Sequence, residues 1–461
     1  MTPKEHRKPV RERTRRLIAE DRKVLWHPFT QMAGWLESEE ILVIEKGKGC
    51  ILVDTDGNRY LDGVSSLWCN LHGHRVGSID RAIRKQLSDV AHSTLLGLAG
   101  PSSIRLAGML VDSAPRGLRR VFFSDNGATA VEAAVKMALQ YHRQTGRPEK
   151  TLFAGLTDAY HGDTIGSVSI GGMDLFHGIF SPLRFEVVRV PSPFCYRCPE
   201  KLDRRRCAMD CARRAEEILA RHAGRLAALV IEPCVQGAAG MIVHPEGYLR
   251  RMKRACEKHS ILLIADEVAT GFGRTGTLFA CSGEEVTPDL LCLAKGITGG
   301  YLPLAATLAT EEIFAAFLGT HESHRAFYHG HTYTGNALAC AAAIESMKLL
   351  RRRVMPSLPE KIRLFSKLLD EQVRPIPHVG DVRQKGLMVG IECVADAATR
   401  EPYPAAERIG HRVILAARAR GVLLRPLGDV VVLMPPLAIA PGDMKRLVET
   451  AAESILEVTG A

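Results

Sequence analysis

The chain has 461 residues, of which 46% are hydrophobic and 24% are charged, proportions that are usual for a folded globular protein. Lysine and arginine outnumber aspartate and glutamate by 61 to 51, so the formal net charge at pH 7 is +10. No apolar run is long enough to span a bilayer, and we therefore expect no membrane partner.

The first 23 residues form a basic arm without the apolar segment of a secretory signal. The arm also carries acidic residues that are rare in transit peptides, namely Glu5, Glu12, Glu20 and Asp21. We therefore expect a cytoplasmic protein in which cysteines in apolar contexts are reduced core residues. A basic surface can hold nucleic acid, but we interpret the arm as a solvated tail that also attracts anionic metabolites.

The arm is followed by the heptapeptide WHPFTQM at residues 26–32 and by a segment, residues 47–63, with a tight-turn signal at Asp56-Gly57. This segment predicts two short strands joined by that turn. Residues 65–74, SSLWCNLHGH, come next, and a tryptophan in such an apolar stretch is more often a core residue than a ligand-binding one.

Further along the chain, we expect a helix over residues 80–92 and a strand over residues 121–123. The small residues SDNGATA at 124–130 then open a helix that runs through about Gln140. The first N–H groups of a helix have no partner within it, and the helix dipole favours an anion there. This turn is suited to a phosphate, although any strand–helix turn has a similar pattern.

Further apolar runs predict strands over residues 228–231, 261–265, 290–294, 304–308 and 387–392. The alternation of strands and helices from Val121 to Leu308 predicts an α/β fold with a mostly parallel sheet and helices on both faces. We expect an N-terminal arm with part of a small domain (residues 1–75), a large domain (76–345) and a C-terminal small domain (346–461).

Asp266 follows the apolar run Ile261–Ala265, and Lys295 follows the run Leu290–Ala294. In open α/β sheets, ligands bind at the carboxyl ends of the strands, where both side chains are expected. A lysine and a carboxylate at this edge suit pyridoxal phosphate (PLP), because the amine can bond to the aldehyde while the carboxylate keeps the pyridine nitrogen protonated. Taken alone, the two residues are better explained as an ion pair on a loop.

The sequences ADEVATGFGRTG (265–276) and CLAKGITGGYLP (292–303) resemble the class III aminotransferases, which are PLP enzymes of fold type I. The resemblance extends from Trp26 to about Pro436. It implies a large domain with a mostly parallel sheet, a small α+β domain, PLP as cofactor and a homodimer with shared active sites. It implies small-molecule substrates and neither nucleic acid nor a membrane as a partner.

The resemblance also assigns roles to residues in matching motifs. Lys295, Asp266 and Tyr160 are expected to be catalytic, with Tyr160 flat over the cofactor ring and Val268 beneath it. The cofactor-binding residues that it implies are Gly127, Ala128, Tyr160, Glu232, Asp266, Val268, Lys295, His331 and Thr332. Gly127 and Ala128 match the pair that holds the phosphate, and Thr332 matches a threonine that reaches the partner's cofactor. Glu232 and Gln236 match residues beside the ring oxygen and the substrate entrance.

WHPFTQM resembles the biotin-pathway branch of this family, whose members act on 8-amino-7-oxononanoate. In LLRPLGD (423–429), Arg425 matches the arginine that binds the substrate carboxylate, where bidentate contact would fix the distance to the ketone. The expected substrate-binding residues are Phe29, Leu67, Trp68, Tyr160, Lys295, Gly330 and Arg425.

The amino donor is open between S-adenosylmethionine and L-lysine. Most members of the branch use S-adenosylmethionine and have a tyrosine and a tryptophan where this chain has Phe29 and Leu67. SSLWCNLHGHR (65–75) and AHSTLLG (91–97) look more like relatives that use lysine, which needs no aromatic platform for an adenine.

Other functions remain possible on the same residues. One is a class III transaminase of the ornithine or β-alanine type, against which WHPFTQM and LLRPLGD argue. Another is an aminomutase, which would retain the amino group. A regulatory or nucleic-acid-binding protein that uses the basic arm would not need Asp266 and Lys295.

Cys195, Cys198, Cys207 and Cys211 lie outside the common family pattern. Four thiols at this spacing can bind zinc or an iron–sulfur cluster, and the arginines at 204–206 would stabilise thiolates. We favour a solvent-facing insertion without a metal, in which the thiols are reduced or adventitiously paired.

Overall fold

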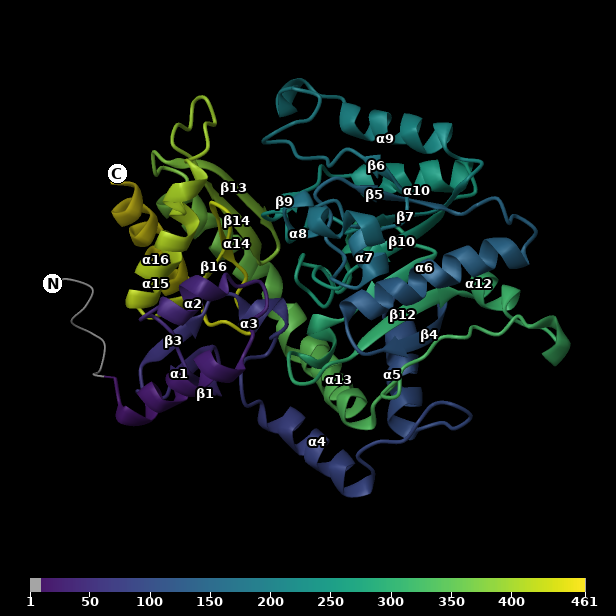
Figure 1. Cartoon of the computed structure of the whole chain (residues 1–461), viewed down its shortest axis with the longest axis horizontal. Helices are drawn as coiled ribbons and strands as arrows, with labels where there is room; N and C mark the ends of the chain where they lie inside the picture. The colour runs from purple at the N-terminus through teal and green to yellow at the C-terminus, as the bar shows by residue number, and fades with distance from the viewer. Residues whose placement is uncertain (1–9, 461) are drawn as a thin grey trace.

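The computed structural model describes residues 10–460, with the backbone alone at residue 205. A seven-stranded sheet forms the larger part of the molecule, on the right in Figure 1. Its strands are, in spatial order, β4 (Leu118–Ser124), β12 (Ala305–Thr310), β11 (Leu290–Leu293), β10 (Leu262–Asp266), β7 (Leu226–Ile231), β5 (Leu152–Leu156) and β6 (Val187–Val190). Only β12 runs antiparallel to its neighbours, which confirms the predicted α/β fold with a mostly parallel sheet.

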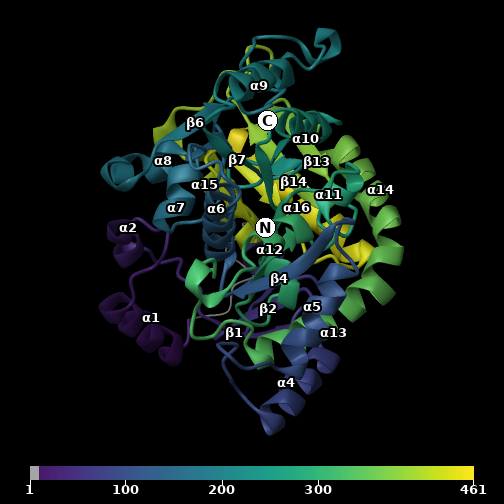
Figure 2. The ribbon, with the colours of Figure 1, turned by 90° about the vertical axis from the view of Figure 1, so that its right-hand side faces the viewer.

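Both faces of this sheet are buried, as the continuous apolar runs predict. Successive residues of a strand point to opposite faces, so Val230 packs with Ala134 in one apolar cluster while Leu229 packs with Leu249 in another. The first face is covered by α6 (Gly127–Gln144) and α7 (Ile165–Ile170), and the second by α5 (Pro101–Val111), α9 (Asp210–Arg221), α10 (Tyr248–Lys258) and α13 (Ala337–Leu349) (Figure 2).

Two four-stranded sheets lie beside the large one. The first contains β1 (Ile44–Lys48), β2 (Ile51–Asp54), β3 (Arg59–Asp62) and β15 (Val422–Leu423). The second contains β13 (Val379–Lys385), β14 (Met388–Cys393), β17 (Val430–Leu433) and β16 (Arg425–Leu427). Because β3 pairs in parallel with β15, the first sheet joins the two ends of the chain. The boundaries at residues 75 and 345 stay a prediction.

The remaining helices and short elements complete the described chain. The helices are α1 (Glu12–Val24), α2 (Met32–Glu37), α3 (Ser65–Trp68), α4 (Gly77–Asp89), α8 (Asp174–His177), α11 (Ala280–Gly283), α12 (Glu311–Ala316), α14 (Met355–Gln372), α15 (Ile409–Ala419) and α16 (Pro441–Thr459). A two-stranded sheet pairs β8 (Val235–Gln236) with β9 (Ile242–Val243). Single turns of other helix types are η2 (Gly178–Leu183), η3 (Arg204–Arg206), η4 (Lys295–Thr298), η5 (His321–Ser323), η6 (Leu350–Val354) and η7 (Ala405–Glu407).

The interpretation of the basic arm as a tail is wrong for residues 12–24, which form the helix α1. Thr14 is the buried residue of this helix, and its hydroxyl donates to Asp56 Oδ1 at 2.6 Å in the predicted hairpin turn. The sequence did not indicate this helix because most of its residues are charged and lie on its exposed face. Residues 1–9 of the arm lie outside the described residues. Over residues 10–460, no helix has the length and apolar character needed to cross a membrane.

Candidate active site

A cavity of about 790 Å³ opens where the carboxyl ends of the large sheet's strands meet the two smaller sheets. The large sheet contributes the residues that follow β4, β7, β10 and β11, and the smaller part contributes Arg425 and Leu427 of β16. Eleven of the residues predicted from sequence line it: Phe29, Leu67, Trp68, Gly127, Ala128, Tyr160, Glu232, Asp266, Val268, Lys295 and Arg425.

Gly330, His331 and Thr332 do not line this cavity within a single copy of the chain. His331 approaches its edge, where Nδ1 lies 3.1 Å from Oδ2 of the lining residue Asp125. Their expected contacts with a partner's cofactor and substrate stay a prediction.

Lys295 stands at the end of β11, where the backbone turns with φ +42° into η4. Its Nζ lies 5.2 Å from the centre of the Trp68 ring. Burial lowers the pKa of the amine below its usual 10.5, although the charges of Asp266 and Glu232 act in the opposite direction. The lowered pKa makes the neutral amine more accessible than in a free lysine, and the neutral form is the one that attacks an aldehyde or accepts a proton.

Asp266 is held by two contacts at the end of β10. Its Oδ1 accepts the Val268 N–H at 3.0 Å, and its Oδ2 lies 2.7 Å from His161 Nδ1. The other ring nitrogen of His161, Nε2, is buried and has no hydrogen-bond partner among the described residues. A histidine in this position orients the carboxylate towards the cavity, which both residues line.

Glu232 connects the end of β7 to two neighbouring loops. Its carboxylate accepts the N–H groups of Tyr160 at 3.1 Å and Gly237 at 2.9 Å. Burial raises its pKa to about 7, and the nearby charge of Asp266 adds to this effect. By contrast, Gln236 is fully buried between Ser192 and Thr157 and does not line the cavity, so its expected place at the substrate entrance is wrong.

Tyr160 forms part of the cavity wall. Its hydroxyl donates to Asp163 Oδ2 at 2.7 Å, and its ring stacks on His177 with centroids 5.9 Å apart. Burial raises the pKa of the phenol well above 10, and the bond to Asp163 acts in the same direction. The ring is therefore a neutral, fixed surface on which a flat ligand can stack.

The predicted phosphate turn is tightly packed at the N-terminus of α6. Asn126 caps the helix by accepting the Thr129 N–H at 3.1 Å. A Cβ at Gly127 would lie 2.6 Å from Val268 Cγ1, and one at Gly162 would lie 2.4 Å from Ala128 Cβ. The absence of these side chains brings the backbone against the cavity, which an oxyanion needs in order to reach the helix N–H groups.

These features fit PLP, because a lysine whose pKa is lowered, an oriented carboxylate and the N-terminal turn of α6 line one cavity. Lys295 would hold the aldehyde carbon, Asp266 the pyridine nitrogen, and the turn at Gly127 and Ala128 the phosphate. Tyr160 and Val268 would hold the faces of the ring.

Arg425 lies in β16 and lines the cavity. Burial lowers its pKa, and the guanidinium forms no ion pair or hydrogen bond with another described residue. An arginine without a carboxylate partner in a cavity is suited to bind the carboxylate of a ligand.

Sequence reasoning missed several residues of the site. His161 and Asp163 lie beside Tyr160 in AYHGDT, and their motif was the available signal. Asp125, Cys69 and Phe176 also line the cavity. Asp125 lies in the predicted phosphate turn and Cys69 in SSLWCNLHGH, whereas the sequence around Phe176 carries no signal of a ligand.

The four cysteines of the insertion line one small cavity of about 160 Å³. All are free thiols, and over residues 10–460 no group of three or more suitable side chains is arranged to hold a metal ion. Burial raises the pKa of Cys195, with Arg204 acting in the opposite direction, and raises that of Cys211 to about 11. Arg204 thus favours the Cys195 thiolate as expected, but burial outweighs it, and no arginine among the described side chains offsets the effect of burial on Cys211.

The family model "Aminotransferase class-III" matches residues 36–455. A protein of Nitratidesulfovibrio vulgaris named adenosylmethionine-8-amino-7-oxononanoate aminotransferase is 57% identical over 97% of this chain and 83% of its own length. A protein of the same name from Geobacter sulfurreducens is 52% identical over 95% of this chain and 97% of its own.

The solved structures to which this chain is similar are also aminotransferases. The crystal structure of adenosylmethionine-8-amino-7-oxononanoate aminotransferase from Methanocaldococcus jannaschii superposes with a TM-score of 0.91 at 44% identity, covering 96% of this chain and 99% of that chain. An amine transaminase from an uncultivated Pseudomonas species, in its PLP-bound form, has a TM-score of 0.86 at 39% identity and covers 93% and 98%.

Proposed function

Because the chain belongs to the class III aminotransferase family and is a PLP-dependent enzyme, we propose that it transfers an amino group to 8-amino-7-oxononanoate, giving 7,8-diaminononanoate for biotin synthesis. The near full-length identity to relatives with that name supports this substrate. The observation in the site that carries the proposal is Arg425, a guanidinium without a partner among the described residues, in the same cavity as Lys295.

The residues divide the chemical work between them. Bound PLP supplies an electron sink for the carbon that loses a proton. Lys295, whose pKa is lowered by burial, takes the proton from that carbon and returns it to the cofactor side. Asp266, oriented by His161, holds the positive charge of a protonated ring nitrogen in place.

Arg425 positions the acceptor, because a carboxylate bound to its fork fixes the distance from that end of the substrate to the reacting carbon. The other walls on this side are Phe29, Leu67 and Trp68, which are apolar and suit the methylene chain between the carboxylate and the ketone.

We propose S-adenosylmethionine as the amino donor, as the names of the relatives indicate. Lysine remains the second candidate for one specific reason. Phe29 lacks a phenol hydroxyl and makes an edge contact with Phe176 at 5.3 Å, while Leu67 is half exposed and offers no aromatic face for an adenine.

We also propose a cytoplasmic homodimer with shared sites. Large apolar side chains are exposed in a single copy, including Trp26 at 88% and, in the loop at residues 328–336, Tyr328 at 73%. Contact with a second copy would cover such side chains and bring the loop at residues 328–336 towards the neighbouring cavity.

The test is a donor screen with the PLP-loaded enzyme and 8-amino-7-oxononanoate as acceptor. Product formation, followed by mass spectrometry, is expected with S-adenosylmethionine, and formation with lysine alone would replace the donor assignment. If neither donor gives product while ornithine or β-alanine is transaminated to a simple keto acid, the substrate proposal fails and the enzyme is another class III transaminase.

A further inference from the structure

The element α3 (Ser65–Trp68) is a left-handed helical turn built without glycine. Its four residues have φ values of +52°, +48°, +69° and +70°. The N–H groups of Trp68 and Cys69 donate to the carbonyls four residues earlier, at 2.8 and 3.1 Å. L-residues avoid this conformation because Cβ crowds the following carbonyl oxygen, so a run of four needs strong support from its surroundings.

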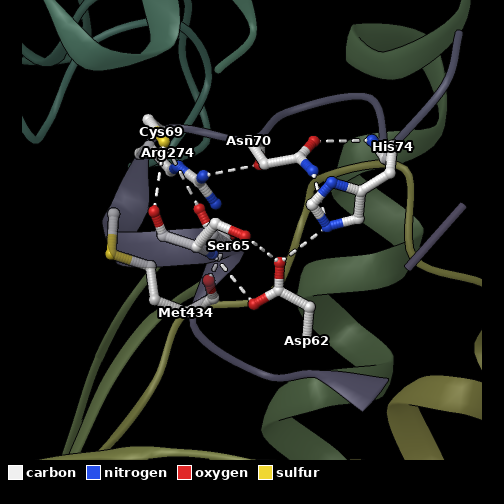
Figure 3. Close-up of polar contacts among 9 residues, drawn as sticks. Asp62, Ser65, Cys69, Asn70, His74, Arg274 and Met434 are labelled. Atoms are coloured by element: carbon white, nitrogen blue, oxygen red, sulfur yellow. Dashed lines mark hydrogen bonds and ion pairs between the residues drawn. The ribbon is translucent and has the colours of Figure 1, made fainter. Parts of the chain in front are cut away.

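Asp62, at the end of β3, supplies part of that support (Figure 3). Its Oδ1 accepts the Ser66 N–H at 2.9 Å, and its Oδ2 accepts the Ser66 hydroxyl at 2.8 Å. The same Oδ2 lies 3.1 Å from His74 Nε2. The carboxylate is buried, which pushes its pKa up, but the bonds from His74 and Ser66 outweigh burial and lower the pKa, so Asp62 is charged at neutral pH.

The turn is also anchored on its other side. The hydroxyl of Ser65 donates to the carbonyl of Met434, and the guanidinium of Arg274 donates to the carbonyls of Trp68 at 3.3 Å and Asn70 at 2.9 Å (Figure 3). Asp62 is itself fixed, because it lies opposite Leu423 in the parallel pairing of β3 with β15. The turn is therefore clamped between two rigid elements.

This conformation decides where two cavity residues point. It places the Trp68 ring 5.2 Å from Lys295 Nζ and against Gly237, where a Cβ would lie 3.3 Å from the indole. It leaves Leu67 half exposed in the cavity wall. Because side-chain direction follows the backbone dihedrals, a turn that relaxed to negative φ would point both side chains elsewhere.

We propose that Asp62 is a positioning residue, whose carboxylate holds the turn Ser65–Trp68 in the left-handed conformation that puts Trp68 beside Lys295 and Leu67 in the substrate wall. The kinetic part of this inference rests on the proposed function. The conformational part is measured on the cofactor-free protein and does not depend on it.

Asp54 offers a matched control in the same hairpin. It is equally buried and caps a turn in the same way, accepting the N–H groups of Asp56 at 3.0 Å and Asn58 at 2.8 Å and the hydroxyl of Tyr60 at 3.0 Å. It neither lines the cavity nor contacts α3.

The conformational readout is tryptophan fluorescence. The chain has three tryptophans, so Trp26→Phe and Trp35→Phe leave Trp68 as the only emitter. In this background, Asp62→Ala should shift the emission to longer wavelength and raise the acrylamide quenching constant about threefold, because the indole leaves its buried site. Asp54→Ala should leave both quantities unchanged even if it lowers thermal stability.

The kinetic readout is the division of the effect between KM and kcat. Asp62→Ala should raise KM for 8-amino-7-oxononanoate about tenfold and change kcat by less than about threefold, because the wall is disturbed while the residues on the large sheet stay in place. Asp54→Ala should retain the KM of the parent.

Rescue separates positioning from general stability. Glycine adopts positive φ without a Cβ penalty, so Ser66→Gly added to Asp62→Ala should return the emission and KM towards the parent values. If Asp62→Ala does not fold, Asp62→Asn provides the measurement, because it retains one acceptor for the Ser66 N–H but loses the charge and the second oxygen, which accepts the Ser66 hydroxyl and faces His74.

Unchanged emission and KM in the Asp62 variants, or the same changes in Asp54→Ala, would overturn the proposal. A different result is an emission shift in Asp62→Ala while the parent enzyme itself does not act on 8-amino-7-oxononanoate. In that case the positioning of the turn by Asp62 stands and the proposed substrate fails.

Discussion

Asp266 illustrates how single residues acquire their role in this protein. Its two oxygens are occupied by the Val268 N–H and by His161, so the carboxylate has one orientation in the cavity. Asp266→Asn keeps the shape but removes the charge that a protonated ring nitrogen needs. We expect kcat/KM to fall by several orders of magnitude, on the order of 4 kcal/mol in the barrier.

The control for this prediction is Asp289→Asn. Asp289 also accepts a strand N–H, from Leu263 at 2.7 Å, but it precedes β11 and lies at the opposite edge of the sheet. Steady-state kinetics on both variants test whether the role of Asp266 is chemical or structural. A loss of activity within about threefold for Asp266→Asn would show that its role is structural.

Arg425 carries the residue-scale prediction about specificity. Its guanidinium has no ion pair among the described residues, so its removal strands no buried acid and should not disturb the fold. Arg425→Gln should weaken binding of the keto acid about a hundredfold, the loss expected for a bidentate charged contact, and leave the donor half-reaction nearly intact. Single-turnover absorbance measurements separate the two half-reactions, and equal damage to both would contradict the assignment.

At the scale of elements, the end of β10 is tied to α11 through Glu267. This fully buried carboxylate accepts the N–H groups of Ala280 and Cys281, both at 2.7 Å, and so caps the short helix. Burial raises its pKa from 4.5 to about 7, with the helix N–H groups opposing the shift. The folded protein therefore binds a proton over a range of pH in which the unfolded chain has released it.

This shift has a defined sign for stability. Between pH 4.5 and about 7 the folded state binds more protons at Glu267 than the unfolded state, so its contribution to the free energy of unfolding is present below pH 4.5 and is lost as pH rises through 7. Denaturant unfolding of the cofactor-free protein at pH 5 and pH 8 should show Glu267→Gln losing less stability at pH 8, by about 3 kcal/mol. If Glu267→Gln lowered the free energy of unfolding by the same amount at pH 5 and pH 8, the raised pKa of Glu267 would be contradicted.

At the scale of the whole molecule, the proposed dimer makes each cavity depend on two chains. Thr332 does not line the cavity of its own chain, whereas Lys295 does. Lys295→Ala and Thr332→Ala should each lower activity when purified alone. In mixed dimers, one of the two sites would combine an intact Lys295 with an intact Thr332, and activity should recover towards half of wild type per mixed dimer.

Mixing two samples of Lys295→Ala is the control for this experiment, and it should give no recovery. The recovered activity must also increase with the fraction of mixed dimers, which can be measured when the two variants carry tags of different size. Formation of mixed dimers without recovered activity would show that Thr332 serves its own chain.

The sequence by itself determined the elements whose signal is local. Residues 261–265 and 290–294 are apolar without interruption because their strands are covered on both faces, and this pattern placed Asp266 and Lys295 at one edge of a parallel sheet. The motifs around these two residues were enough to indicate the family and the cofactor.

Only the tertiary structure decided the features that depend on contacts between distant segments. Asp266 meets His161 across 105 residues and Ser65 meets Met434 across 369, and no pattern within either segment indicates its partner. The left-handed turn at Ser65–Trp68 contains no glycine, so the sequence gives no sign of its positive φ angles. Its strain is offset by contacts with Asp62 and Arg274, which lie outside the turn. Local residue patterns report burial and secondary structure, whereas the orientation of a side chain in the cavity depends on packing that only the complete fold creates.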